Sequence, residues 1–238
     1  MKNLKFLTVA VMLTASTVAF AQFSNTNVNN ASSGQARYVD TNPYDRLTIS
    51  YNPLTVAPDK DNLDNGSLDA IAIAYTHGFS LSQTMPLFLE TGVKLNYGFK
   101  TVDGEFSDLF NDDASSENKE TKITMFYASV PVNLAYKFTL TNSDVSIQPF
   151  IGLNLKYNLS GKSVTEYEYD DDDEKDLFDK KDMGGKDATW KHFQMGWHIG
   201  AGLNYKALYL GLSYGADFSE ICKKTKTSNF AVSVGYNF

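Results

Sequence analysis

FAVSVGYNF, residues 230–238, is the stretch of sequence that decides the fold. Its even-numbered positions hold Phe, Val, Val, Tyr and Phe, whereas its odd-numbered positions hold Ala, Ser, Gly and Asn. Successive side chains of a β-strand point to opposite faces, so an alternation of period two predicts a strand with one apolar face and one face of small, polar residues.

The same alternation recurs along most of the chain. It is found in residues 46–53, 69–79, 87–100, 126–138, 145–158, 193–204 and 208–215. Together with residues 230–238, these stretches predict about eight strands, with ends uncertain by a few residues. The fold class is therefore all-β.

The connections between these strands alternate in length. Short turns follow the second, fourth and sixth strands, and longer polar loops follow the first, third, fifth and seventh. This is typical of a membrane barrel, because its periplasmic turns are short, its outer loops are long and an even strand count returns both termini to the periplasm. We therefore predict an eight-stranded antiparallel up-and-down transmembrane β-barrel over residues 46–238.

A secreted soluble β-sandwich or a lipocalin-like binding protein is the competing fold, since alternation fits any half-buried sheet. Two features favour the membrane barrel. Several strands alternate for about ten residues, enough to cross a bilayer at a tilt. The polar face is rich in Gly, Asn, Ser and Gln, which suit a narrow lumen. Its few charges are expected to form an internal salt-bridge network: Glu90, Lys94, Lys100 and Lys156.

The amino terminus reads as a signal peptide. Met1–Lys5 is basic, residues 6–20 are apolar or small, and Ala19-Phe20-Ala21 fits the small-x-small pattern of signal peptidase, with cleavage before Gln22. The apolar run is too short for a membrane-spanning helix, which needs about 20 residues. Residues 1–21 are thus predicted to be removed. The Asn-, Ser- and Thr-rich segment 22–45 is predicted to be a flexible periplasmic segment.

Composition excludes several classes of protein. The net charge of -7 disfavours binding to nucleic acid. The single cysteine, Cys222, rules out an internal disulfide, and it lies too far from the amino terminus to carry a lipoprotein anchor.

No catalytic, cofactor-binding or metal-binding residue can be assigned. An enzyme would need a nucleophile or carboxylate beside one of the histidines His77, His192 and His198, and only Ser80 and Ser82 lie close in sequence to His77. We therefore predict that the protein is not an enzyme and has no cofactor.

Residues 161–191 form the most acidic part of the chain, with eleven acidic side chains against six lysines. The run Asp170–Glu174 could supply oxygen ligands to calcium or magnesium, but it lacks the spacing of an EF-hand loop. Crowded carboxylates repel one another. We therefore expect an extracellular, mobile and extended loop that is open to protease.

From about Arg46 to Phe238 the chain resembles the small outer-membrane β-barrel proteins, the porin-like domain common in Bacteroidota. The closing residues AVSVGYNF carry the resemblance best. Alternating apolar residues that end in Phe238, with Tyr236 two positions before it, look like the signal by which the barrel assembly machinery recognises its clients. The resemblance implies contact with outer-membrane lipid and lipopolysaccharide.

We predict an integral protein of the cell outer membrane, with both termini periplasmic, a largely filled lumen, surface-exposed loops and a structural or surface-interaction role. A narrow porin for ions or very small solutes is the alternative, although eight strands leave a lumen that side chains nearly fill. The sequence does not indicate a ligand for the loops.

Overall fold

The computed structural model describes residues 40–59, 64–104, 106, 109, 119–140, 144–167 and 172–238. The predicted signal peptide, 1–21, and residues 22–39 of the predicted periplasmic segment lie outside this part of the chain. The first strand begins at Tyr44, slightly before the predicted start of the barrel at Arg46. No helix among the described residues is long and apolar enough to cross a membrane.

The described residues form one antiparallel sheet of 11 strands. The strands are β1 (Tyr44–Tyr51), β2 (Leu54–Pro58), β3 (Gly66–Ser80), β4 (Leu87–Asp103), β5 (Lys119–Tyr136), β6 (Phe138–Thr139), β7 (Val145–Tyr167), β8 (Asp173–Asp176), β9 (Phe193–Tyr205), β10 (Leu208–Asp217) and β11 (Thr225–Asn237).

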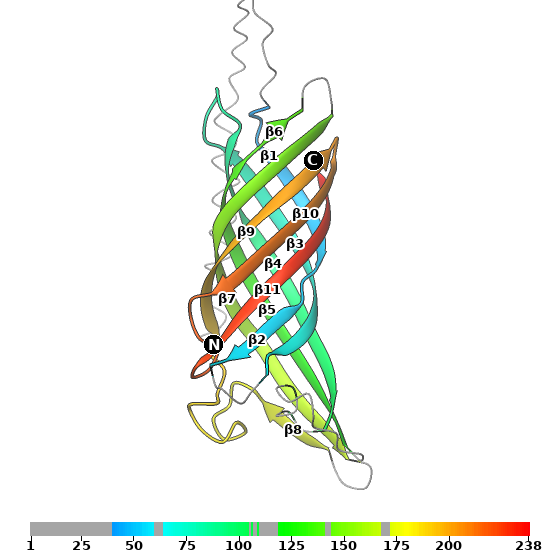
Figure 1. Cartoon of the computed structure of the whole chain (residues 1–238), viewed down its shortest axis with the longest axis vertical. Helices are drawn as coiled ribbons and strands as arrows, with labels where there is room; N and C mark the ends of the chain where they lie inside the picture. The colour runs from blue at the N-terminus through cyan, green and yellow to red at the C-terminus, as the bar shows by residue number, and fades with distance from the viewer. Residues whose placement is uncertain are drawn as a thin grey trace, which may run out of the picture.

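The sheet closes on itself because β1 pairs with both β11 and β3. The closed ring runs β1-β3-β4-β5-β7-β9-β10-β11, which gives eight strands around the barrel in chain order. Figure 1 shows these strands winding obliquely round a common axis. The predicted all-β, antiparallel, up-and-down barrel is confirmed, and eight of the 11 described strands form its closed ring.

The three remaining strands continue or extend the ring. β2 follows β1 after an interruption at Asn52 and Pro53, and it pairs with the same two neighbours, β11 and β3. Pro53 cannot donate to a ladder, so the break falls where a backbone donor is missing. β6 extends β5 beyond Lys137, and β8 folds back onto the far end of β7.

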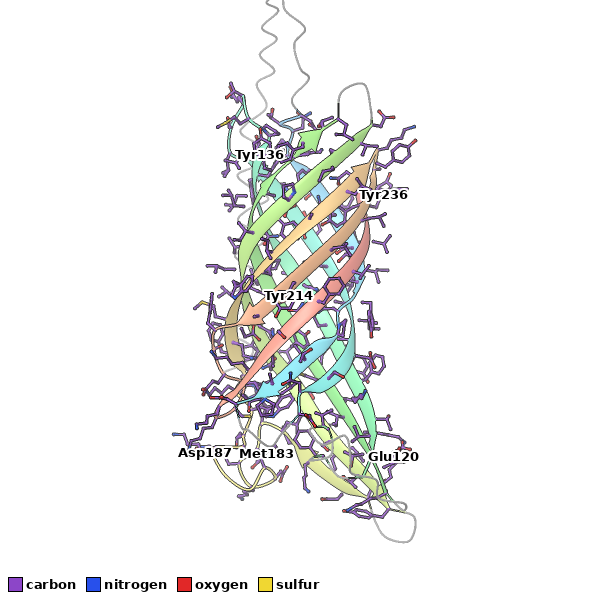
Figure 2. The ribbon with its side chains drawn as sticks, viewed as in Figure 1. Glu120, Tyr136, Met183, Asp187, Tyr214 and Tyr236 are labelled. Atoms are coloured by element: carbon purple, nitrogen blue, oxygen red, sulfur yellow. The ribbon has the colours of Figure 1, made fainter. Side chains whose placement is uncertain are left out.

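The alternation sorts side chains between the two faces as predicted. Ile49, Leu210 and Val234 point outward and are 64%, 53% and 58% exposed, as expected for side chains that would contact lipid. Their neighbours on the opposite parity, such as Ser50 and Tyr209, are buried in the lumen. Figure 2 shows the side chains that project from the outer surface of the barrel.

β7 is longer than predicted and contains a bulge. Tyr127 pairs with Asn158, whereas Phe126 pairs with Ser160, so Leu159 is an extra residue on β7. Before the bulge the even positions are buried, and after it the odd positions Gly161 and Ser163 are buried instead. A bulge shifts the parity of a strand by one residue, which lets β7 continue past the predicted end at residue 158 without turning its face.

The barrel has two different ends. Of the described connections, the turn end holds 81–86 and 206–207 together with the terminal Phe238, and the loop end holds 177–192 and 218–224. In Figure 2, Tyr136 and Tyr236 lie toward the turn end, Tyr214 lies midway, and Glu120 and Asp187 lie at the loop end.

Candidate functional site in the lumen and at the loop end

Two layers of buried ion pairs cross the lumen. In the turn-end layer, Nη1 of Arg46 lies 3.2 Å from Oε1 of Glu90, and both side chains are almost fully buried. Nη2 of Arg46 donates a hydrogen bond of 2.9 Å to Oε1 of Gln148. The hydroxyl of Tyr44 donates to the Glu90 carboxylate at 2.5 Å. The Glu90 carboxylate therefore has the donors that a buried charge requires.

Tyr209 completes the turn-end layer by stacking on Arg46. Cζ of the guanidinium lies 3.7 Å from the centroid of the tyrosine ring, a cation–π contact. Glycines on β9 and β10 make room for this ring, because a Cβ at Gly202 would lie 2.3 Å and one at Gly211 2.6 Å from atoms of Tyr209. Small residues on the inward face thus have a packing purpose here.

In the loop-end layer, Nζ of Lys156 lies 2.6 Å from Oδ2 of Asp217. Nε2 of Gln194 donates to the same oxygen at 3.1 Å, and the hydroxyl of Thr227 also donates to it. Asn158 extends the layer by donating to Oε1 of Gln194 at 3.0 Å. These five buried side chains come from β7, β9, β10 and β11 and join strands that are not all neighbours in the ring.

The predicted internal salt-bridge network is correct only in part. Glu90 and Lys156 do form buried ion pairs, but their partners are Arg46 and Asp217, which the sequence analysis did not single out. The inward parity of these two partners was the signal that could have found them. Lys94 and Lys100 form no ion pair with any residue that the structure describes.

A cavity of about 110 Å³ lies in the lumen, bounded by Arg46 and Glu90 of one layer and by Asp217 of the other. Lys94 and His198 line its wall. We call this space the lumen cavity. His198 is held in place by Asn133, because Nε2 of its ring lies 2.5 Å from Oδ1 of that amide.

Beyond the loop-end layer, the inward side chains become apolar. Leu54, Val56, Leu68, Ile123 and Met125 form a buried cluster with four residues from the loops, Leu109, Leu177, Trp190 and Ile221. We call these nine residues the apolar cap. Full burial of one such side chain contributes about 1.5–3 kcal/mol, so the cap is a substantial core at the mouth of the barrel.

The prediction of an extended, mobile loop over residues 161–191 is wrong. Residues 161–167 belong to β7, and β8 pairs with them. Leu177 and Trp190 are 0% and 4% exposed within the apolar cap. Exposed ion pairs such as Lys162–Glu174 contribute little. The buried apolar side chains therefore dominate over the repulsion between carboxylates. Residues 168–171 lie outside the described part of the chain.

A hollow of about 510 Å³ lies against the apolar cap at the loop end, and we call it the loop-end groove. Its lining is largely apolar with two lysines: Val56, Phe106, Met183, Trp190, Lys223 and Lys224 are among the residues that form it. Nζ of Lys223 lies 2.5 Å from Oδ2 of Asp187, and this hydrogen bond raises the pKa of Lys223. Figure 2 shows Met183 and Asp187 side by side at this end.

The three histidines have different hydrogen-bond partners and are not brought together. Nδ1 of His77 is 2.7 Å from Oδ1 of Asp45 at the turn end, and Ser80 donates to the carbonyl of Ser82 rather than to the ring. His192 contacts the carbonyl of Asn158 through Nδ1 at 2.8 Å. Among the described residues, no three His, Cys, Asp or Glu side chains are grouped as ligands of a metal would be.

Comparison with known proteins finds one family. The profile described as outer membrane protein beta-barrel domain matches residues 20–219. Among solved structures, Ail, the attachment invasion locus protein of Yersinia pestis, is 15% identical, with 82% of this chain and 98% of that chain covered and a TM-score of 0.40.

Two further structures are similar to the same degree. Neisserial surface protein A is 13% identical, with 82% of this chain and 97% of that chain covered and a TM-score of 0.40. The outer membrane enzyme PagL is 9% identical, with 79% and 98% covered and a TM-score of 0.39. No curated protein matches the chain.

Proposed function

The chain belongs to the outer membrane protein beta-barrel domain family, and from this membership we propose that it is an integral outer-membrane barrel with a filled lumen and a contact surface at its loop end. The proposed role is structural or surface-interacting and is not catalytic. Its location is the outer membrane. The apolar outer face is the part of the molecule that would contact the hydrocarbon of this membrane.

The arrangement of the lumen is the observation that carries the proposal. Two buried ion-pair layers, centred on Glu90 and Asp217, stand across it, and the apolar cap lies beyond them. Eight-stranded barrels have interiors just wide enough for side chains to fill. A narrow porin, the alternative role, would have to open a path through both layers and the cap.

We propose that the turn end faces the periplasm and that the loop end faces outward. This orientation is supported by the lengths of the connections in the sequence, which are short at the end that holds Phe238 and long at the other. In this scheme residues 1–21 are removed during export. The mature chain then begins at or next to Gln22, and mass analysis of outer-membrane material tests this start.

The proposed partners follow from the same orientation. Outer-membrane lipid and lipopolysaccharide would surround the outward-facing side chains. Phe238 is 67% exposed, and its backbone exchanges hydrogen bonds of 2.9 and 3.2 Å with Asp45, next to the seam where β11 meets β1. An exposed aromatic terminus on the last strand supports its recognition by the barrel assembly machinery. We propose that the loops at the loop end form the region where an extracellular partner would make contact.

Labelling of single cysteines on intact cells tests the orientation. Cys222 is first replaced by serine, and a cysteine is then placed at Asp187 on the loop end or at Asp144 on the turn end, whose side chains are 71% and 64% exposed. A membrane-impermeant maleimide should label D187C on intact cells and D144C only after permeabilisation. The reverse result would invert the topology.

Planar-bilayer recording tests the filled lumen. The purified wild-type protein should give no discrete conductance steps. A variant in which Leu177 and Trp190 of the cap, Lys156 and Asp217 of one layer, and Arg46 and Glu90 of the other are all changed to alanine serves as the opened control. Regular wild-type steps at physiological salt would instead support the narrow porin.

A further inference from the structure

Lys94 stands apart from the other charged side chains that line the lumen cavity. Arg46 pairs with Glu90, and Asp217 pairs with Lys156. Lys94, by contrast, has no hydrogen-bond or ion-pair partner for its ammonium group among the described residues, which include all the cavity-lining strands. The charged groups around the cavity therefore leave one positive charge without compensation.

The register of the strands places a second cation beside Lys94. Lys94 on β4 is aligned with Ser129 on β5, and Ser129 is aligned with Lys156 on β7. Two strand spacings separate the Cα atoms of the lysines by roughly 10 Å. Lys156 is paired with Asp217, so the carboxylate of Asp217 is already compensated and does not neutralise Lys94.

The cavity wall also carries free hydroxyl groups. Thr48, Ser50, Thr76, Ser129, Ser213 and Ser233 all line the lumen cavity, and none of their hydroxyls forms a hydrogen bond with a residue that the structure describes. Each hydroxyl can donate one O–H to a guest in the cavity. Hydroxyl donors that share a cavity with an unpaired ammonium group are suited to binding a negative ion.

We propose that the lumen cavity binds one small monovalent anion of the chloride class, held by the ammonium group of Lys94 and by the hydroxyls around it. An ammonium group that is enclosed in a membrane protein without a counter-charge is costly, and a bound anion removes this cost. The cavity, at about 110 Å³, exceeds the roughly 10–15 Å³ that one water molecule needs. It can therefore hold an anion with part of its hydration shell.

The carboxylates that line the cavity favour an anion with a single negative charge. Glu90 and Asp217 also line the cavity, so an anion with two charges would be repelled by them and would exceed the single positive charge available. The bound anion would compensate the charge of Lys94 and would stabilise the folded barrel. This inference concerns the inside of the barrel and does not depend on the surface role proposed above.

Thermal unfolding of the refolded mature protein tests the proposal. The apparent melting temperature is compared in sodium chloride and in sodium gluconate at equal ionic strength, because gluconate is too large for the cavity. Chloride should raise the wild-type value by about 2–8 °C, the size of effect that a saturated ligand gives in a chain of this length. In Lys94→Met the difference should vanish. Lys100→Met is the matched control, since Lys100 lies on the same face of β4 but outside the cavity wall.

A direct measurement avoids any dependence on variants. Protein refolded and crystallised in sodium bromide should show an anomalous peak inside the cavity, next to Nζ of Lys94. Peaks on the outer surface alone, meaning an adventitious ion only, would overturn the proposal. Equal wild-type melting temperatures in the two salts would also overturn it, because chloride would then not bind the folded barrel in preference to gluconate. If Lys94→Met does not fold, Lys94→Gln replaces it, and the bromide peak in the wild type still decides.

Discussion

Lys156 and Asp217 form a buried ion pair across the lumen, with Nζ 2.6 Å from Oδ2, although 61 residues separate them in the chain. They lie on β7 and β10, which are not neighbours, because β9 stands between them in the sheet. The contact therefore depends on the curvature of the sheet, which brings the inward side chains of β7 and β10 together over β9.

Removal of one partner of this pair should destabilise the barrel strongly. We expect Lys156→Met to cost about 3–5 kcal/mol, because it leaves the carboxylate of Asp217 buried and unpaired. The double variant Lys156→Met/Asp217→Leu should recover most of this loss. Urea unfolding of the refolded protein in detergent measures both values. Additive losses in the double variant would contradict an ion pair as the source of the effect.

A charged side chain on the outer face should destabilise the barrel more near the middle of the strands than near their ends. Val232, which pairs with Leu212 near the middle of β10 and β11, should not tolerate arginine: Val232→Arg is expected to cost about 2–4 kcal/mol. Tyr236→Arg, on the same face but at the turn end, should cost about 0–1 kcal/mol. Folding into lipid vesicles gives the two free energies. Equal costs would mean that this face does not meet the hydrocarbon.

The apolar cap should control protease access to the acidic segment. Trp190 is 4% exposed, and Trp190→Ala should remove about 3–5 kcal/mol of local stability because it leaves a cavity. Trypsin applied to whole cells should cut between Lys175 and Lys191 about tenfold faster or more in this variant, since opening becomes more frequent. Phe218→Ala is the control, because Phe218 is an exposed aromatic at the same end. Rapid cleavage of the wild type would restore the picture of an open loop.

The carboxyl terminus should matter for assembly more than for stability. Deletion of Phe238 should lower the amount of barrel in the outer membrane and leave unfolded chain in the periplasm, as judged by the heat-modifiable shift on gels. Phe138→Ala, which removes another exposed aromatic at the turn end, should leave assembly unchanged. Equal membrane levels for the deletion and the wild type would show that Phe238 is not an assembly signal.

The sequence analysis did not predict the packed loop end, because it considered the acidic segment alone. The crowded carboxylates of residues 170–174 indicate a solvated loop, and this reasoning holds while the segment is considered alone. Leu177 and Trp190 are separated by charged residues in the acidic segment 161–191, and nothing near them in sequence predicts a surface on which they would pack. Their partners, such as Ile123 and Val56, come from the inward faces of distant strands.

By itself, the sequence determined the eight strands of the ring, their order, the two kinds of connection and, up to the bulge at Leu159, the outward and inward faces, because successive side chains of a regular strand point to opposite faces. Only the tertiary structure decided which inward groups meet. Arg46 pairs with Glu90, 44 residues away in the chain, whereas Lys94 lines the lumen cavity without an ion-pair partner among the described residues. Such partnerships depend on how the closed ring aligns strands across the lumen. Parity assigns a residue to the lumen but not to a neighbour within it, because contacts across the lumen are set by the tilt and stagger of the whole barrel.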